Sequence, residues 1–129
     1  MRKAHFLTKN HGSRVPNNLI FVDTETDSSK EDQRLILGCA THVQFVSADS
    51  QDYFEDKIRF TRHKQFWDWA THSAGKRTLW LMSHNLNFDG AILKADTELI
   101  KRGWTCTRYI NDGVPPVIIR FTKNKESIQ

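Results

Sequence analysis

Acidic residues crowd the end of one apolar run near the N-terminus. The run LIFVDTETD covers residues 19–27, where Asp23, Glu25 and Asp27 alternate with single threonines. The simplest explanation is that the chain reaches water, where acids are well solvated. The alternative is that mutually repelling carboxylates share a divalent cation. Oxygen ligands without neighbouring His or Cys pairs suit Mg²⁺ or Mn²⁺.

A further acid follows another apolar run. Residues 77–84, RTLWLMSH, are expected to form a buried strand, with His84 as a buried histidine at its end. Asp89 comes next, in the first turn of an expected helix. An acid there complements the helix dipole, and Asn85 or Asn87 is an ordinary helix cap. By itself, Asp89 indicates only a helix start.

Taken together, these acids predict a metal site. Because side chains alternate along a strand, Asp23 and Glu25 share one face, with Thr24 opposite. Sites in α/β sheets lie beyond the carboxyl ends of strands, where Asp89 would join them. Two divalent ions about 3.5–4 Å apart are a standard device for in-line attack on a phosphodiester. We therefore predict that Asp23, Glu25 and Asp89 converge, bind metal and carry catalysis.

The rest of the pattern supplies the elements that must position these residues. Strands are expected at 19–23, 34–46 and 52–60, followed by a helix that Thr61 caps and that ends before Gly75. The strand 77–84 comes next, then one helix over 88–102 ended by Gly103, and finally a hairpin of 104–110 and 117–121. This order indicates an α/β fold with a mixed sheet. An antiparallel meander and a parallel strand would make up the sheet, with helices packed on it.

Two motifs resemble those of a known enzyme family. VDTET looks like the Asp-x-Glu motif, and HNLNFDGAIL like the Asn-x-x-x-Asp motif, of the DEDD-type 3′–5′ exonucleases, which have a ribonuclease H-like fold. The string SHNLNFDGAIL, followed by a helix and an aromatic hairpin, is most similar to the proofreading exonuclease domain of family B DNA polymerases. The protein-primed phage and organellar type is the most similar of these. The resemblance covers residues 19 to 122, approximately.

The resemblance implies metal-binding roles. Asp23 would bridge two ions of Mg²⁺ or Mn²⁺, Glu25 would bind the more tightly held ion, and Asp89 would serve the second ion through water. The family also needs a fourth acid, with a Tyr or His four residues before it to orient the attacking water. Asp112, in a turn, and Glu126, near the end, do not match that pattern. One weakly bound ion is therefore expected.

The resemblance also implies contacts with nucleic acid. Thr24 and Thr26 would lie against the 3′-terminal nucleotide, Asn85 would contact the strand, and Phe88 would pack on a base or sugar. Aromatic packing on single-stranded bases is tolerant of sequence. A core-facing helix position is the alternative for Phe88.

Residues 19–129 therefore look like the N-terminal part of an exonuclease domain. The first interpretation is a metal-dependent 3′–5′ exonuclease that acts on single-stranded DNA ends, completed by a downstream polymerase domain or a second subunit. The second is a catalytically incomplete ribonuclease H-like module that binds nucleic acid or a protein partner. For this polypeptide alone, the missing fourth acid favours the second interpretation.

Charge separates an N-terminal arm from this domain. Residues 1–18 hold Arg2, Lys3, Lys9 and Arg14 and no acid, and these four side chains account for the formal net charge of +4. A solvated arm is one explanation. An arm that contacts nucleic-acid phosphates is the other.

Composition is that of a globular protein, and no apolar window approaches the roughly 18 residues of a membrane span. Cys39 and Cys106 lie in apolar, strand-like runs without disulfide or zinc spacing. We expect them to be buried free thiols, which favours a reducing, intracellular compartment such as the cytoplasm. A phage- or organelle-encoded protein fits the same expectation.

Overall fold

A computed structural model describes residues 16–27, 29, 33–47, 51–110 and 118–129. Its elements, in chain order, are β1 (Asn18–Thr26), β2 (Leu35–Phe45), β3 (Tyr53–Phe60), α1 (His63–Ala74), β4 (Trp80–Met82), α2 (Leu86–Ile92), α3 (Ala95–Lys101), β5 (Thr105–Ile110), β6 (Ile118–Lys123) and β7 (Glu126–Ile128).

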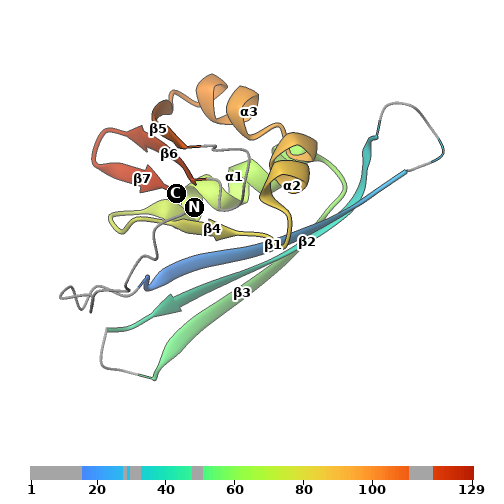
Figure 1. The fold of residues 1–129 in the computed structure, drawn as a ribbon. Helices are drawn as coiled ribbons and strands as arrows, with labels where there is room; N and C mark the ends of the chain where they lie inside the picture. Colours follow the sequence, from blue (N-terminus) through green and yellow to red (C-terminus); the bar gives the residue numbers. More distant parts are fainter. Residues whose placement is uncertain (1–15, 28, 30–32, 48–50, 111–117) are drawn as a thin grey trace, which may run out of the picture.

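The strands form two sheets (Figure 1). The larger has the order β3-β2-β1-β4, in which β1 pairs antiparallel with β2 and parallel with β4. The second has the order β5-β6-β7, and a parallel bridge from Leu79 to Ile128 links β7 to the chain just before β4. The predicted mixed α/β sheet is confirmed, and it is compatible with a ribonuclease H-like fold. The sequence did not predict β7.

Side-chain alternation gives the larger sheet an inner and an outer face. Along β1, Ile20, Val22 and Thr24 are buried on the inner face, whereas Asp23 and Glu25 are exposed on the outer face. The helices lie on one side of this sheet (Figure 1). The buried side chains of Ile20, Val22 and Thr24 face these helices, and Thr24 contacts Asp89 of α2, so the side that the helices cover is the inner face.

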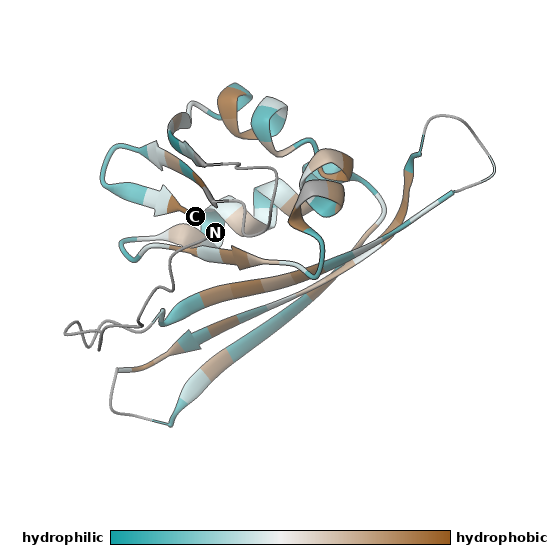
Figure 2. Cartoon of the chain, in the orientation of Figure 1, coloured by the Kyte–Doolittle hydropathy of each residue, from teal (hydrophilic) through white to brown (hydrophobic). Residues whose placement is uncertain are grey.

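The core fills the space between this inner face, the helices and the second sheet. Figure 2 shows hydrophobic stretches along the neighbouring strands β1 and β4. The largest fully buried side chains in the described part of the chain are Trp67, Phe60, Phe66, Ile20, Leu79, Leu93, Leu99 and Asn18. Burial of a large apolar side chain stabilises the fold by about 1.5–3 kcal/mol, so this cluster fixes the helices on the sheet.

The one polar residue in that set, Asn18, ties β1 to α1. Its Nδ2 donates to the carbonyls of Ser73 and Ala74 at 3.1 and 3.3 Å, at the end of α1 where carbonyls lack helical partners. Its Oδ1 lies 2.5 Å from Nε2 of His42 on β2. Burial lowers the pKa of His42, and nearby Asp56 partly opposes that change.

The first helix begins one residue later than predicted. Arg62, not Thr61, is the N-cap of α1. The Gln65 side chain accepts from the backbone N–H of both residues at 3.1 Å, which satisfies donors at the helix start. Gly75 follows the helix, as predicted, with a φ of 55° that a glycine tolerates.

The single helix predicted over residues 88–102 is wrong: two short helices, α2 and α3, take its place. Lys94 separates them in the left-handed conformation, with φ 52° and ψ 48°. The carbonyl of Leu93 accepts from Nε1 of Trp67 at 2.7 Å. A core tryptophan therefore donates a hydrogen bond to a backbone carbonyl at the point where the predicted helix is interrupted. The periodicity of the sequence does not indicate this contact.

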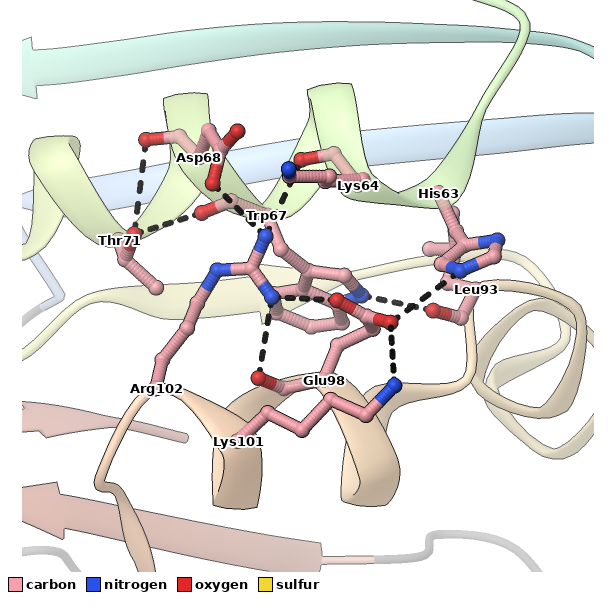
Figure 3. Close-up of polar contacts among 9 residues, drawn as sticks. All are labelled: His63, Lys64, Trp67, Asp68, Thr71, Leu93, Glu98, Lys101 and Arg102. Atoms are coloured by element: carbon pink, nitrogen blue, oxygen red, sulfur yellow. Dashed lines mark hydrogen bonds and ion pairs between the residues drawn. The ribbon is translucent and has the colours of Figure 1, made fainter.

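A charged cluster anchors α3 on α1 (Figure 3). Arg102 forms ion pairs with Glu98 and with Asp68, the latter at 2.7 Å, and His63 Nε2 lies 3.2 Å from Glu98. The hydrogen bond from Arg102 holds the pKa of the Glu98 carboxyl below its ordinary value, against the opposing effect of burial.

Four sequence-based expectations of burial are wrong. The strand expected to be buried over residues 77–84 is only Trp80–Met82, and it is half-buried to exposed. Cys39 and Cys106 are free but exposed, and His84 is exposed as well. Cys39 lies on the outer face of β2, opposite Asp23. These residues lie in runs of mostly apolar residues, and such runs do not indicate which face of a sheet is exposed to solvent.

None of the helices within the described ranges has the length and hydrophobicity that a membrane crossing requires.

Candidate functional site

Two of the predicted acids lie together on the outer face of β1. Asp23 and Glu25 are exposed, and they pair in register with Cys39 and Leu37 of β2. Their separation by two residues along a strand places their Cα atoms about 6.6 Å apart. The predicted sharing of one face is confirmed, and both carboxylates are open to solvent.

The third acid lies on the inner side. Asp89 is only 3% exposed, in the first turn of α2, and its Oδ1 accepts a hydrogen bond of 2.6 Å from Oγ1 of Thr24. Asn85 is the N-cap of α2, and its side chain accepts from the backbone N–H of Phe88 at 3.4 Å. Ordinary helix-start roles are therefore confirmed for Asn85 and Asp89.

The predicted convergence of the three carboxylates does not occur in this arrangement. Thr24 points to the face opposite Asp23 and Glu25, and Asp89 is bound to Thr24. Across the residues that the structure describes, no group of three or more His, Cys, Asp or Glu side chains could hold a metal ion. The residues present do not fit a three-carboxylate metal centre. The outer pair, Asp23 and Glu25, could supply at most two protein ligands.

The other predicted contacts fall in different places. Thr26 is half-buried where the register of β1 shifts, and Phe88 is half-buried on α2. Neither position tests a contact with nucleic acid. The arm residues lie outside the described residues, as does Asp112. Glu126 lies in β7, in the second sheet.

Asp27 forms part of the loop after β1. Its Oδ1 accepts from the backbone N–H and the hydroxyl of Ser29, at 2.9 and 2.5 Å. These hydrogen bonds lower the pKa of Asp27. The carboxylate therefore stabilises a turn, in addition to being solvated.

Two basic residues that the sequence analysis did not single out share the outer face with the acids. Arg59 pairs with Cys39, which pairs with Asp23, so Arg59 lies two strand spacings, or about 10 Å, from Asp23. Lys57 lies on the same face, 3.3 Å from Glu55. Phe21, also on this face, is 48% exposed. Alternation along β3 could have predicted this grouping, because residues 57 and 59 share one face.

Comparisons with known proteins support the fold. No protein-family profile matches the sequence, and a search of curated proteins finds no match. A solved structure of phi29 DNA polymerase, in a ternary complex with primer-template DNA and incoming nucleotide substrates, is similar with a TM-score of 0.51 and 16% sequence identity. The similarity covers 89% of this chain but 20% of that one. It shows a fold similar to that of part of this polymerase.

Proposed function

We propose that this chain is a polymerase-related nuclease module of the 3′–5′ exonuclease type, which engages single-stranded DNA ends. One observation carries the proposal. The Asp23–Glu25 motif lies toward the carboxyl end of β1, and the Asn85–Asp89 motif follows β4, the parallel neighbour of β1, in a fold similar to part of a DNA polymerase. Ligands of α/β sheets bind beyond the carboxyl ends of such strands.

The outer face supplies groups that suit a nucleic-acid strand. Arg59 and Lys57 could contact phosphates, and the exposed ring of Phe21 offers a surface for a base. Asp23 and Glu25 would hold one ion of Mg²⁺ or Mn²⁺ weakly, since two carboxylates and water molecules suit such a cation. A bound ion would offset the repulsion of the two acids and could coordinate a phosphate oxygen.

A specific observation favours a second candidate function. The carboxylate of Asp89 is buried and already accepts a hydrogen bond from Thr24, so it is not available on the face that carries Asp23 and Glu25. The second candidate is a catalytically incomplete module that binds single-stranded nucleic acid without hydrolysing it. Its completion would need groups from a polymerase domain or a second subunit.

A single assay separates these two functions. A single-stranded oligonucleotide labelled at its 5′ end is incubated with the chain and Mg²⁺ or Mn²⁺, and binding is measured in parallel by fluorescence anisotropy. We expect saturable binding. We also expect very slow shortening from the 3′ end, or none, because no residue matches the family's fourth acid or its water-orienting Tyr or His. Loss of general-base assistance alone lowers a rate about 10²–10⁴-fold.

The control is the variant Asp23→Ala/Glu25→Ala. Brisk digestion that this variant lacks would establish the exonuclease and show that the site is completed in solution. Binding without digestion would establish the incomplete module. Absence of any binding would refute both functions.

A further inference from the structure

A large cavity lies away from the acids of β1. It has a volume of about 910 Å³, and its lining residues come mainly from β4, the helices α2 and α3 and the second sheet. This volume falls within the range of roughly 300–1,000 Å³ that small-molecule sites occupy. Neither Asp23 nor Glu25 lines the cavity, so it is separate from the metal-binding pair of the proposed function.

The cavity has an apolar floor and a polar rim. Trp67, Leu99, Phe121 and Ile128 line it and are no more than 4% exposed. The rim includes five exposed polar residues: His84, Asn85, Lys94, Asp96 and Thr97. Such a combination buries an apolar ligand and fixes its orientation through a few polar groups.

One buried polar atom in the lining lacks a partner. The Oγ of Ser83 is inaccessible to solvent and has no hydrogen-bond partner among the described residues. Burial of an unsatisfied hydroxyl costs about 1–3 kcal/mol. A rotation of the Ser83 side chain that turns its hydroxyl toward the cavity would let a ligand with a hydrogen-bonding edge remove that cost.

The charges of the lining indicate a neutral ligand. The single lysine of the cavity, Lys94, is offset by Asp96, and the lining contains no arginine. Phosphate groups are held by several basic side chains or by clustered backbone N–H groups. The aromatic rings of Trp80, Tyr109 and Phe121 instead favour a flat aromatic partner, because aromatic pairs gain energy from offset or edge contacts.

We propose that this cavity binds an uncharged, planar heteroaromatic ring of the nucleobase type. The ring packs against the aromatic lining and presents its hydrogen-bonding edge to Ser83. The base could belong to a free nucleoside or to the end of a nucleic-acid strand. Asn85, on the rim, is also a predicted strand contact, but the proposal stands without the exonuclease function.

The experiment uses 2-aminopurine riboside, an uncharged fluorescent nucleoside, titrated with the full chain. Stacking on aromatic side chains quenches its fluorescence, so saturable quenching reports binding. A single-stranded oligonucleotide that ends in 2-aminopurine forms the second arm, and the riboside 5′-triphosphate forms the third. Binding by the riboside identifies a free nucleoside as a ligand, whereas binding by the oligonucleotide alone identifies a strand end. Either outcome supports the proposal where a variant that fills the cavity weakens the quenching, because the exposed ring of Phe21 on the outer face could also quench a base of the oligonucleotide.

Gly90 provides a matched pair of variants. It lines the cavity, and a Cβ added there would meet no atom within 4 Å. Gly90→Trp should fill part of the cavity and weaken binding at least tenfold, without lowering the melting temperature. Gly90→Ala, which adds only one methyl group, should bind as the parent does. Ser83→Ala should weaken binding about 2- to 10-fold, the range expected for one hydrogen bond.

Three results would overturn the proposal. The first is the absence of saturable quenching with both the riboside and the oligonucleotide. The second is unchanged affinity in Gly90→Trp while that variant remains folded by circular dichroism. The third is binding of the triphosphate more than tenfold tighter than that of the riboside, which would identify a phosphate site instead.

Discussion

Thr24 links the two sequence motifs through one hydrogen bond, from its hydroxyl to Asp89. The bond satisfies a buried carboxylate and joins β1 to α2, so Asp89 has a structural role whether or not it ever binds metal. Asp23 and Glu25 have no such partner on the inner face. A divalent ion should therefore depend on the outer pair and not on Asp89.

We expect Mn²⁺ to raise the melting temperature through that outer pair. A ligand at tenfold excess over its Kd stabilises the folded state by about 1.4 kcal/mol. For a domain of this length the shift is roughly 4–7 °C. Asp23→Asn should abolish the shift, and Asp89→Asn should retain it, since an asparagine Oδ1 can still accept from Thr24. Differential scanning fluorimetry measures all three proteins.

Two contrary outcomes are informative. A shift that persists in Asp23→Asn places the ion elsewhere. A shift that disappears in Asp89→Asn means that the three acids converge in solution after all.

Glycines at two positions should respond in opposite ways to the same substitution. A Cβ at Gly38 would lie 2.0 Å from Cζ of Phe60, a buried ring that covers this glycine. Gly38→Ala should destabilise the fold by about 2 kcal/mol or more, because the ring must move within a packed core. Gly90→Ala adds its methyl group to open space within α2, so it should stabilise by up to about 1 kcal/mol. Urea unfolding measures both, and similar effects at the two positions would contradict the close approach at Gly38.

At the scale of elements, periodicity predicted the strands well and the second helix poorly. β1, β2 and β3 follow from apolar and alternating runs, which depend only on local sequence. The break at Lys94 depends on Trp67, a residue 26 positions before Leu93, whose indole donates to the Leu93 carbonyl. No local pattern contains that contact.

The prediction that the three carboxylates converge was wrong for a related reason. The sequence placed Asp23, Glu25 and Asp89 correctly on a strand and a helix start at neighbouring strand ends. It did not say which face of β1 receives α2. That choice depends on which side chains of β1 join the core, and Val22 and Thr24 do so instead of Asp23.

The contact between α1 and α3 should make stability depend on pH. In the folded chain the pKa of Glu98 is lowered, chiefly by the hydrogen bond from Arg102. The folded state therefore binds this proton less readily than the unfolded state. The stabilisation is fully present above the unfolded pKa of about 4.3, and it is lost as the pH falls through the lower folded value.

Urea unfolding at pH 7, 4 and 3 tests this expectation. The parent should lose more stability over this range than Glu98→Gln, which cannot titrate at this position. Parallel losses in the two proteins would show that the ion pairs of Figure 3 do not contribute to the acid sensitivity.

At the scale of the whole molecule, net positive charge is concentrated at one end of the sequence. Arg2, Lys3, Lys9 and Arg14 account for the net charge of +4, and the rest of the chain is balanced. The outer face of the larger sheet carries both signs, with Lys57 and Arg59 near Asp23, Glu25 and Glu55. Non-specific affinity for a polyanion should therefore come mainly from the arm.

Neutralising these four arm residues together, each to Gln, should weaken single-stranded DNA binding and flatten its dependence on salt. Each phosphate contact on a single strand contributes about 0.7 to the slope of log K against log salt concentration, so four contacts contribute up to about 3. The matched control removes the same charge from exposed basic residues of the domain: Arg34, Lys64, Lys76 and Lys125. If the arm contacts phosphates, its variant loses slope and the control does not. Equal losses of slope in both variants would mean that the arm acts only through the overall charge of the chain. An unchanged slope in the arm variant would mean that the arm is solvated and contacts no phosphates.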